Sequence, residues 1–397
     1  MPKYKIYEVD NTGSLQLGAQ PNIVYIPGAA SKKTEPQLIT RVDALDSAFP
    51  GVTLTKDDSY LLATKLLSLG MQVLYQGFAL VEGDITITTD DWKALEDKNL
   101  YNVRFLSTGA YACPSNAMIT CAANRGDCIA LLDHPKYNDY DVISVREYFE
   151  GFKTATSTLS KDPLSFAAAF TPWFKADLGA SDGSNSDVPA SFGYLLAYAR
   201  SVQANPLWKA AAGVFRGVIP ELKDVDYRLT NAECEVLQAR ASDGEVDLDA
   251  TGDNIGIAIN PIAYRRYSGF AGGFNYVLNG NRTMHENDAK GTIATSFLNV
   301  RALITEISKT LYDASVTYTF EQNSDVLWNN FCALITPLLD KMQSGEGIEG
   351  YRIDRVATTK KARLSARLVI TPIEAVEDFE LEIYLTNSLD EPVTIIE

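Results

Sequence analysis

The sequence is poor in histidine, the residue that enzymes most often use for acid–base chemistry. Only two histidines, His134 and His285, occur among its 397 residues. Histidine changes charge near neutral pH and is the commonest metal ligand, so this scarcity disfavours most hydrolases and metalloenzymes. The chain also lacks a phosphate-binding loop, a nucleophile elbow and an H-E-x-x-H motif. A glycine-rich stretch at 269–274 does not have the order of a dinucleotide fingerprint and is interpreted as a turn.

Closely spaced cysteines are absent as well. The five cysteines, at positions 113, 121, 128, 234 and 332, form no C-x-x-C pair, so no zinc site is expected. This odd number favours synthesis in the reducing cytoplasm. The acidic stretch 247–254 resembles the start of a calcium loop through Asp247, Asp249 and Asp253, but Ala258 stands where the bidentate glutamate belongs. We interpret it as a solvated loop and expect no metal and no cofactor.

Long apolar runs and excess positive charge are missing too. No run of 18 apolar residues occurs, so no membrane insertion is expected. The N-terminus has no hydrophobic segment of a secretory signal, so the sequon at Asn281 should stay unglycosylated. The net charge of −16 argues against nucleic acid as a partner. It also keeps monomers apart, so any assembly requires specific contacts.

Strands and helices alternate through the first half of the chain. An apolar strand is expected at 22–30. A helix that ends at Leu69, before Gly70, leads into a strand from Gln72. The same helix-then-strand order recurs at 88–110 and 115–135, followed by a buried strand at 166–174, a polar loop at 177–187 and a helix at 190–203. This alternation predicts an α/β part with a largely parallel sheet.

From residue 295 the apolar spacing becomes helical. The apolar positions of two expected helices are Phe297, Val300, Ile304, Ile307 and Leu311, then Trp328, Phe331, Ile335, Leu338 and Met342. Ser324 or Asp325 can cap the second helix, and Pro337 should bend it. Strand alternation follows at 363–371 and 379–386. The prediction is therefore α+β overall: an α/β N-terminal portion and a C-terminal helix-on-sheet domain, with extended strand arms at both ends.

Seven stretches occur in the order and spacing of one known family. They are SYLLATKLLSLGMQVLYQGF, AAAFTPWFK, VPASFGYLLAYARSVQANPLWKAAAGVFRG, LNGNRTM, FLNVRALITEISKTL, TFEQNSDVLWNNF and LLDKMQSGEGIEGYRI. Together they resemble the sheath proteins of contractile phage tails and related contractile injection devices. Two departures are a short N-terminal half and a Gly-Ile-Asn segment that appears as IGIAINPI after an acidic insertion. The short half puts extra outer domains in doubt.

The resemblance implies a structural subunit of a virion tail and not an enzyme. Such subunits, six to a ring, stack around a tail tube and contract to drive it through a cell envelope. The implied partners are copies of the chain, the tube protein, and baseplate and tail terminator proteins. The protein would be made in the host bacterial cytoplasm. The implied division is an arm and linker at 1–20, an outer α/β domain at 21–275, a joint at 276–294, an inner domain at 295–378, and a C-terminal strand and arm at 379–397.

The two ends of the chain fit strand exchange between subunits. Residues 1–10 and 392–397 read as strands without a hairpin partner, and a neighbour's open sheet edge could order them. The candidate exchange residues are Lys3, Tyr4, Lys5, Ile6, Glu380, Glu382, Ile383, Val393 and Ile395.

Two internal stretches have expected roles. In the joint, Gly280, Arg282 and Thr283 match the family's Gly-x-Arg-Thr pattern, and Arg282 should satisfy buried carbonyls or a carboxylate. A basic stretch contains Arg352, Arg355, Lys360, Lys361, Arg363 and Arg367. These six residues either face an acidic tail tube or neutralise acidic strands such as 379–386, and the sequence leaves both possibilities open.

Two other functions compete with the sheath subunit. One is a cytoplasmic α/β enzyme with a cleft near His134 and Asp133, which lie together at an expected strand end. The other is a monomeric binding module. Polymer formation distinguishes both from a sheath subunit.

Overall fold

The computed structural model describes residues 20–49, 57–81, 83–156, 162–238, 257–285, 294–359 and 362–375. Several residues singled out above lie outside these ranges. They are Lys3, Tyr4, Lys5, Ile6, Asp247, Asp249, Asp253, Lys360, Lys361, Glu380, Glu382, Ile383, Val393 and Ile395. The strand-exchange and calcium-loop interpretations therefore stay predictions.

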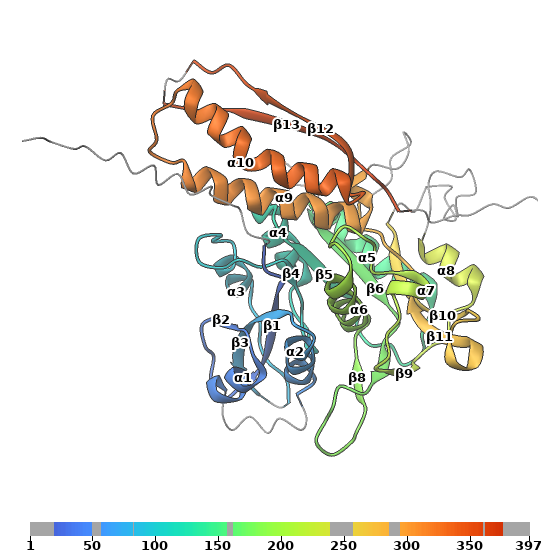
Figure 1. The fold of residues 1–397 in the computed structure, drawn as a ribbon. Helices are drawn as coiled ribbons and strands as arrows, with labels where there is room; N and C mark the ends of the chain where they lie inside the picture. The colour runs from blue at the N-terminus through green and yellow to red at the C-terminus, as the bar shows by residue number, and fades with distance from the viewer. Residues whose placement is uncertain are drawn as a thin grey trace, which may run out of the picture.

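The first part of the chain is built around one large sheet (Figure 1). Its strands are β1 (Ile23–Ala30), β2 (Gln37–Ile39), β3 (Gln72–Ala79), β4 (Phe105–Leu106), β5 (Ile129–Asp133), β6 (Ala167–Thr171), β10 (Ile259–Arg266) and β11 (Phe274–Leu278). Its helices are α1 (Val42–Ala48), α2 (Asp58–Ser68), α3 (Thr89–Ala94), α4 (Ser115–Arg125), α5 (Val142–Thr156), α6 (Ala190–Ala204), α7 (Gly213–Arg216) and α8 (Asn231–Gln238). A short 3-10 turn, η2 (Ala271–Gly273), joins β10 to β11, and another, η1 (Leu164–Phe166), precedes β6.

The strand order β11-β10-β6-β5-β4-β1-β3-β2 makes this a doubly wound α/β sheet. The six inner strands run parallel, and the edge strands β2 and β11 are antiparallel to their neighbours. Helices α2 and α6 pack on one face, and α3, α4 and α5 pack on the other. The predicted α/β part with a largely parallel sheet is confirmed.

Local sequence explains where several elements begin and end. Asp57 caps α2 by accepting a hydrogen bond from the Ser59 backbone at 3.0 Å, and Gly70 ends the following turn with φ of +79°. Helix α4 ends at Gly126, which has φ of +68°. Glycine adopts this left-handed conformation without a steric penalty. The predicted helix-then-strand units are confirmed at these positions.

One predicted strand is divided in the structure. The stretch 166–174 was expected to be a single strand, but β6 ends at Thr171 and β7 (Phe174–Ala176) starts a second sheet of order β8-β7-β9. Its other strands are β8 (Ser186–Val188) and β9 (Leu222–Val225). Pro172 has no backbone N–H with which to continue the ladder, so the chain leaves the large sheet there.

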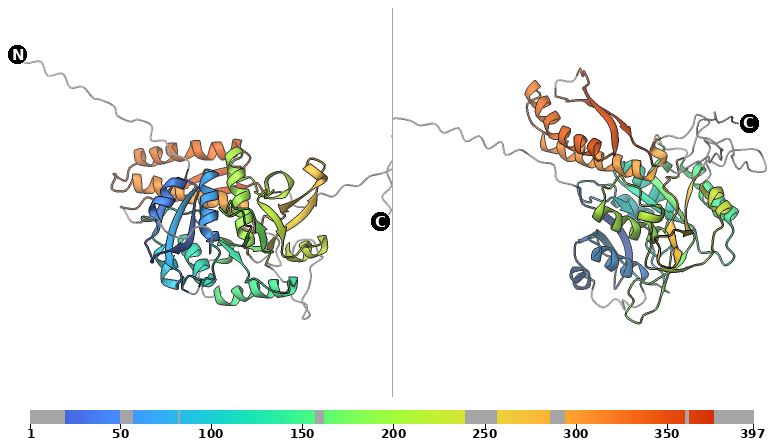
Figure 2. Two further views of the ribbon diagram at one scale, coloured as in Figure 1. Left: turned by 90° about the horizontal axis from the view of Figure 1, so that it is seen from below. Right: turned by 45° about the vertical axis from the view of Figure 1, so that its right-hand side comes forward.

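The C-terminal part is a helical hairpin covered by a two-stranded sheet. It consists of η3 (Ala294–Ser296), α9 (Leu298–Thr317), α10 (Asp325–Ser344), β12 (Ile348–Arg355) and β13 (Ala366–Pro372). The Ser324 hydroxyl caps α10 by accepting from the Leu327 backbone at 3.2 Å, as predicted. Helix α10 runs through Pro337 as one element. Figures 1 and 2 show α9 between the α/β part and α10, with β12 and β13 on the outer side of α10.

The position of α9 between two layers explains its burial. The apolar side of α9, with Leu303, Ile307 and Ala314, packs against Leu334 and Leu339 of α10. The sequence predicted one such face, but the polar side is buried too. That side carries Arg301, Thr305, Glu306, Lys309 and Thr310.

Candidate assembly site

Among the described residues, the two-stranded sheet of β12 and β13 has an open edge on each side. Strands β12 and β13 pair with each other in antiparallel register, with Ile353 opposite Leu368 and Tyr351 opposite Ile370. Within the described part of the chain neither strand has a second neighbour. A two-stranded sheet is marginal in water by itself, and this one rests its four facing side chains on α9 and α10. Both outer edges can accept another strand.

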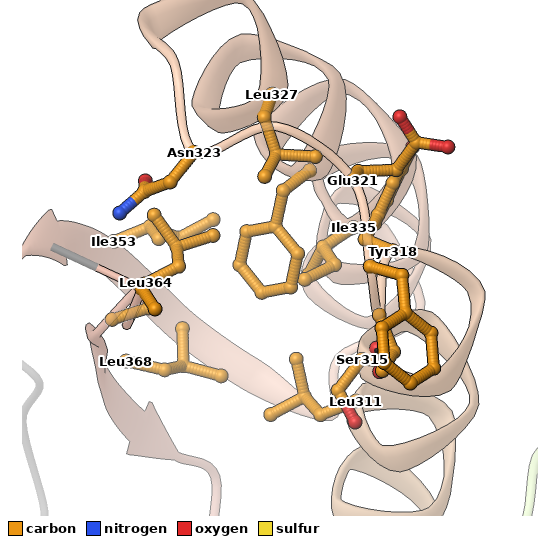
Figure 3. A pocket seen from close by; sticks show the side chains of 15 residues that line it. Leu311, Ser315, Tyr318, Glu321, Asn323, Leu327, Ile335, Ile353, Leu364 and Leu368 are labelled. Atoms are coloured by element: carbon orange, nitrogen blue, oxygen red, sulfur yellow. Dashed lines mark hydrogen bonds between the residues drawn. The ribbon is translucent and has the colours of Figure 1, made fainter.

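An apolar cavity of about 480 Å³ lies under this sheet, near the turn that joins α9 to α10 (Figure 3). Figure 3 shows Leu311 and Ile335 from the helices facing Leu364 and Leu368 from the strand side. Burying apolar side chains here would release about 0.8 kcal/mol for each CH₂ group removed from water. The cavity can therefore bind the apolar face of an added segment.

The turn beside the cavity carries exposed apolar side chains. Phe320 is fully exposed and has φ of +75°, an unusual value for an aromatic residue. Val316 and Val326 flank it and are also exposed. Phe320 also lines the cavity, so this turn is a candidate interaction site.

The basic residues of this part divide between two sides of the sheet. Arg352 and Arg367 alternate with the inward residues Ile353 and Leu368, so they lie on the outer face. Arg352 pairs with Asp354 at 2.9 Å.

Arg355 instead turns back toward α10. Its guanidinium donates to Asp325 at 2.6 Å and lies 5.9 Å from the centre of the Trp328 ring. The side chain of Arg363 is exposed. Of the four described residues, Arg352, Arg363 and Arg367 lie exposed and stay candidates for an external acidic partner, although Arg352 also pairs with Asp354, whereas Arg355 turns toward Asp325 and Trp328 of α10.

The predicted joint connects the large sheet to α9. Asn260 of β10 lies at the centre of the joint. The side-chain amide of Asn260 donates to Ala169 O at 3.0 Å and to Arg282 O at 2.7 Å, and its oxygen accepts from Arg282 N at 2.7 Å. A Cβ on Gly280 would lie 2.7 Å from the side-chain Oδ1 of Asn260 and 2.8 Å from its Cα, so only glycine fits there. Asn260 is the asparagine of the IGIAINPI segment noted in the sequence, but the pattern did not predict that its side chain would bridge β6 and the joint.

Arg282 and Thr283 reach the start of α9. The Arg282 guanidinium donates to the Ser296 hydroxyl at 2.9 Å and stacks on Phe297 at 4.1 Å. Thr283 donates through its backbone to Ser296 O at 2.8 Å and through its hydroxyl to Thr295 O at 3.0 Å. These contacts hold the first turn of α9 against β11 and β10.

A second link joins the polar side of α9 to the N-terminal end of the parallel strands. Arg104, just before β4, is completely buried and donates to Glu306 at 2.5 Å. Lys309 donates to Asn102 and lies 3.6 Å from Asp127, which also pairs with Arg125 at 2.9 Å. Burial lowers the pKa of Lys309 to about 8. Sequence reasoning missed this network because its partners are about 200 residues apart.

The cleft near His134 lies at the opposite end of the strands, beside a cavity of about 570 Å³. His134 Nδ1 bonds Pro135 O at 2.7 Å and Nε2 bonds the Thr171 hydroxyl at 3.0 Å. Burial lowers the pKa of His134 and raises that of Asp133 to about 7. Thr171 is fully buried, so a substrate cannot reach the hydroxyl that His134 would activate. This arrangement gives no support to the competing enzyme hypothesis.

Within the described residues, no three His, Cys, Asp or Glu side chains come together in a way that could hold a metal ion. None of the described helices is long and apolar enough to cross a membrane.

Comparison with solved structures shows the fold over nearly the full chain. No family model matches the sequence, and no curated protein matches it. The contracted sheath complex of the extracellular contractile injection system PVC is 16% identical with a TM-score of 0.67, covering 98% of this chain and 99% of that one. A chain of the six-fold symmetrised baseplate of the anti-feeding prophage is 14% identical with a TM-score of 0.61, covering 97% and 100%.

A sheath tail protein from Desulfitobacterium hafniense is 11% identical with a TM-score of 0.55, covering 94% of this chain and 100% of that one. The chain thus has the fold of contractile sheath proteins, as the sequence resemblance predicted.

Proposed function

We propose that this chain is a structural subunit of a contractile tail sheath. In this proposal it polymerises as helical stacked rings, six subunits to a ring, around a tail tube, and contracts to drive the tube through a cell envelope. The observation that carries the proposal is the two-stranded sheet, open at both edges among the described residues, above an apolar cavity, in a chain whose fold matches a sheath complex over 98% of its length. The chain has no catalytic role in this proposal.

The two chain ends leave the C-terminal part at opposite ends of its helical hairpin. The Gln20 side chain donates to Asp313 at 2.5 Å, near the C-terminal end of α9. The Ile373 backbone donates to Gly347 O at 3.2 Å, near the other end of the hairpin. A 20-residue helix spans about 30 Å. Arms that start so far apart can reach different neighbours, which is what a continuous polymer requires.

The energy of strand exchange favours a multivalent lattice. About five backbone hydrogen bonds from a donated strand contribute roughly 3–7 kcal/mol. Two apolar side chains buried in the cavity add roughly 3–6 kcal/mol. Association costs about 4–15 kcal/mol, so one arm alone is marginal. Several arms for each subunit stabilise the polymer, because every later contact forms within an existing complex.

The same proposal assigns a role to each part. Residues 1–20 are a donated-strand arm and linker, 21–275 form an outer domain, 276–294 a joint, 295–378 an inner domain, and 379–397 a C-terminal strand and donated arm. The outer face of β12 and β13, with Arg352 and Arg367, faces an acidic tail tube. Baseplate and tail terminator proteins bind the two ends of the sheath. The subunit is made in the bacterial cytoplasm and works in the tail of a virion or related particle.

Truncation of the arms tests the proposal. Deleting residues 1–10, or 387–397, should leave a folded subunit with an unchanged circular dichroism spectrum that forms no sheath in negative-stain electron microscopy. A Lys3→Arg/Lys5→Arg variant keeps the strand pattern and should polymerise normally. Polymers of normal length from either truncated chain would contradict strand exchange.

A further inference from the structure

The apolar cavity under β12 and β13 is lined by side chains that still have surface to cover (Figure 3). Leu311, Phe331, Leu364 and Leu368 are only partly buried, and Phe320 is fully exposed. Apolar side chains gathered in this way bind other apolar groups. A subunit with this cavity open would therefore associate with other copies wherever they meet.

The N-terminal segment, residues 1–19, starts beside this cavity. Gln20 fixes its root on α9, because the Gln20 backbone N–H donates to the Glu306 carboxylate at 3.3 Å and its side chain donates to Asp313 at 2.5 Å. Asp313 is two residues from Leu311, which lines the cavity. The root of the segment and the cavity therefore share the same turns of α9.

The N-terminal segment is long enough to reach the cavity of its own subunit. The root and the cavity lie on two sides of one helix, so the path between them is of the order of the helix diameter, about 10–12 Å. A flexible connector of ten residues, 10–19, has an end-to-end distance of about 16–19 Å. Effective concentrations reach about the millimolar range when a short connector matches the distance it has to span.

The C-terminal segment, residues 376–397, starts much farther from the cavity. Its root lies just after β13, where the Ile373 backbone donates to Gly347 O at 3.2 Å. Gly347 follows the end of α10, whereas the cavity is lined by Leu327 and Phe331 near the start of α10. Most of a 20-residue helix, about 30 Å long, separates the two. The position of the roots therefore selects the N-terminal segment.

The sequence of the N-terminal segment suits an apolar cavity. Tyr4 and Ile6 share one face of the expected strand, with Glu8 next on that face toward the connector. Lys3 and Lys5 alternate with them on the other face. Tyr4 and Ile6 can thus enter the cavity while both lysine ammonium groups stay in water.

We propose that in the free subunit the N-terminal segment folds back and caps the cavity of its own chain, with Tyr4 and Ile6 inserted. This inference rests on the proposed sheath function, in which the same segment is later exchanged with a neighbour, as in domain swapping. At micromolar subunit concentration, a millimolar effective concentration favours the internal contact about a thousandfold. A growing sheath offers several contacts at once and reverses this preference. Free subunits then stay apart until an existing lattice or template recruits them.

Binding of ANS, a dye that fluoresces on exposed apolar sites, tests the internal cap in the full chain. The wild type should bind little dye, equally at about 0.1 µM and about 10 µM subunit, because an internal contact does not depend on concentration. Ile6→Asp, which would place a charge in the cavity, should raise the fluorescence at least about fivefold. Lys5→Gln changes the opposite face of the segment and is the matched control, with the dye binding of the wild type.

A synthetic peptide of residues 1–12 identifies the occupant. The chain lacking residues 1–10 should bind this peptide and lose its added dye fluorescence. The wild type should bind the same peptide at least about tenfold more weakly, because its own segment already occupies the cavity.

The remaining outcomes separate the cap from the sheath function. Strong dye binding by the wild type, or a signal that deletion of residues 1–10 leaves unchanged, would overturn the cap. Wild-type dye binding that falls with rising concentration would show exchange between copies instead, and a signal raised only by deletion of 387–397 would assign the cavity to the C-terminal segment. A capped wild type that forms no tubes on a tail tube would support the cap and refute the sheath. Tubes from an uncapped wild type would do the reverse.

Discussion

Replacing Glu306 with glutamine tests how strongly α9 is fixed to the α/β part. The Arg104 guanidinium has no exposed surface, and the Glu306 carboxylate lies 2.5 Å from it. Arginine stays protonated in proteins, so the variant leaves a buried charge without its counter-charge. Breaking a buried pair in this way typically costs 3–5 kcal/mol. We expect Glu306→Gln to lower the free energy of unfolding by about that amount.

Replacing Lys309, on the same helix, should not destabilise the fold as Glu306→Gln does. Its ammonium lies 3.6 Å from Asp127, which keeps its 2.9 Å contact with Arg125 when the lysine is removed. Burial already lowers the pKa of Lys309 to about 8, so the folded state disfavours its charge. Lys309→Met should therefore be neutral or stabilising by about 1–3 kcal/mol at pH 7.

The pKa of Lys309 also predicts a pH dependence. Its folded value of about 8 lies below the unfolded reference of about 10.4, so between these values the unfolded chain binds more protons. Stability should rise as pH increases through that window, by at most roughly 3 kcal/mol. Below pH 8 the wild type carries the full loss of stability that comes from burying the charged Lys309 side chain. The advantage of Lys309→Met should be largest there and vanish near pH 10.5.

Urea unfolding of the full-length variants measures these differences. Tryptophan fluorescence reports on both parts, since Trp92 lies in the α/β core and Trp328 on α10. If Glu306→Gln lowers the free energy of unfolding by less than about 1 kcal/mol, or by no more than Lys309→Met does, the buried Arg104–Glu306 pair does not fix α9. An advantage of Lys309→Met that is the same at pH 7 and pH 10 would refute the explanation from desolvation.

Three further predictions concern the joint, the tube and the connectors. Gly280→Ala should lower the free energy of unfolding by about 1–3 kcal/mol, because its methyl group would lie 2.7 Å from the side-chain oxygen of Asn260. Gly350→Ala is the control, because the space around Gly350 is open. Equal thermal unfolding midpoints for the two variants would contradict this steric reason. Reversing the charges of Lys360 and Lys361 should weaken co-assembly with the tail tube at low salt; unchanged co-sedimentation would leave these lysines without a role in tube binding. Inserting two or three Gly/Ser residues after Asn387 should give sheaths that assemble in the extended state but do not contract, because a longer connector lets neighbouring subunits slide. Normal contraction after triggering, seen by electron microscopy, would show that this connector does not transmit the motion.

Local patterns in the sequence determined which elements form. Helix α2 follows from its capping Asp57, its apolar spacing and the stop at Gly70, all within 14 residues. The cap of α10 at Ser324 and the inward residues of β13 could be predicted for the same reason. Such features depend on contacts between residues close in the chain, which periodicity and capping residues report directly.

Tertiary structure alone decided how these elements meet. Strand order and the central position of Asn260 depend on contacts between distant segments. The apolar spacing of α9 predicted one buried face and made no statement about the side that carries Glu306 and Lys309. That side is buried because Arg104 and Asp127, about 200 residues earlier, supply opposite charges at that surface. A helical pattern shows which side of a helix is apolar, but only the partner that packs against the other side decides whether charges there meet water or each other.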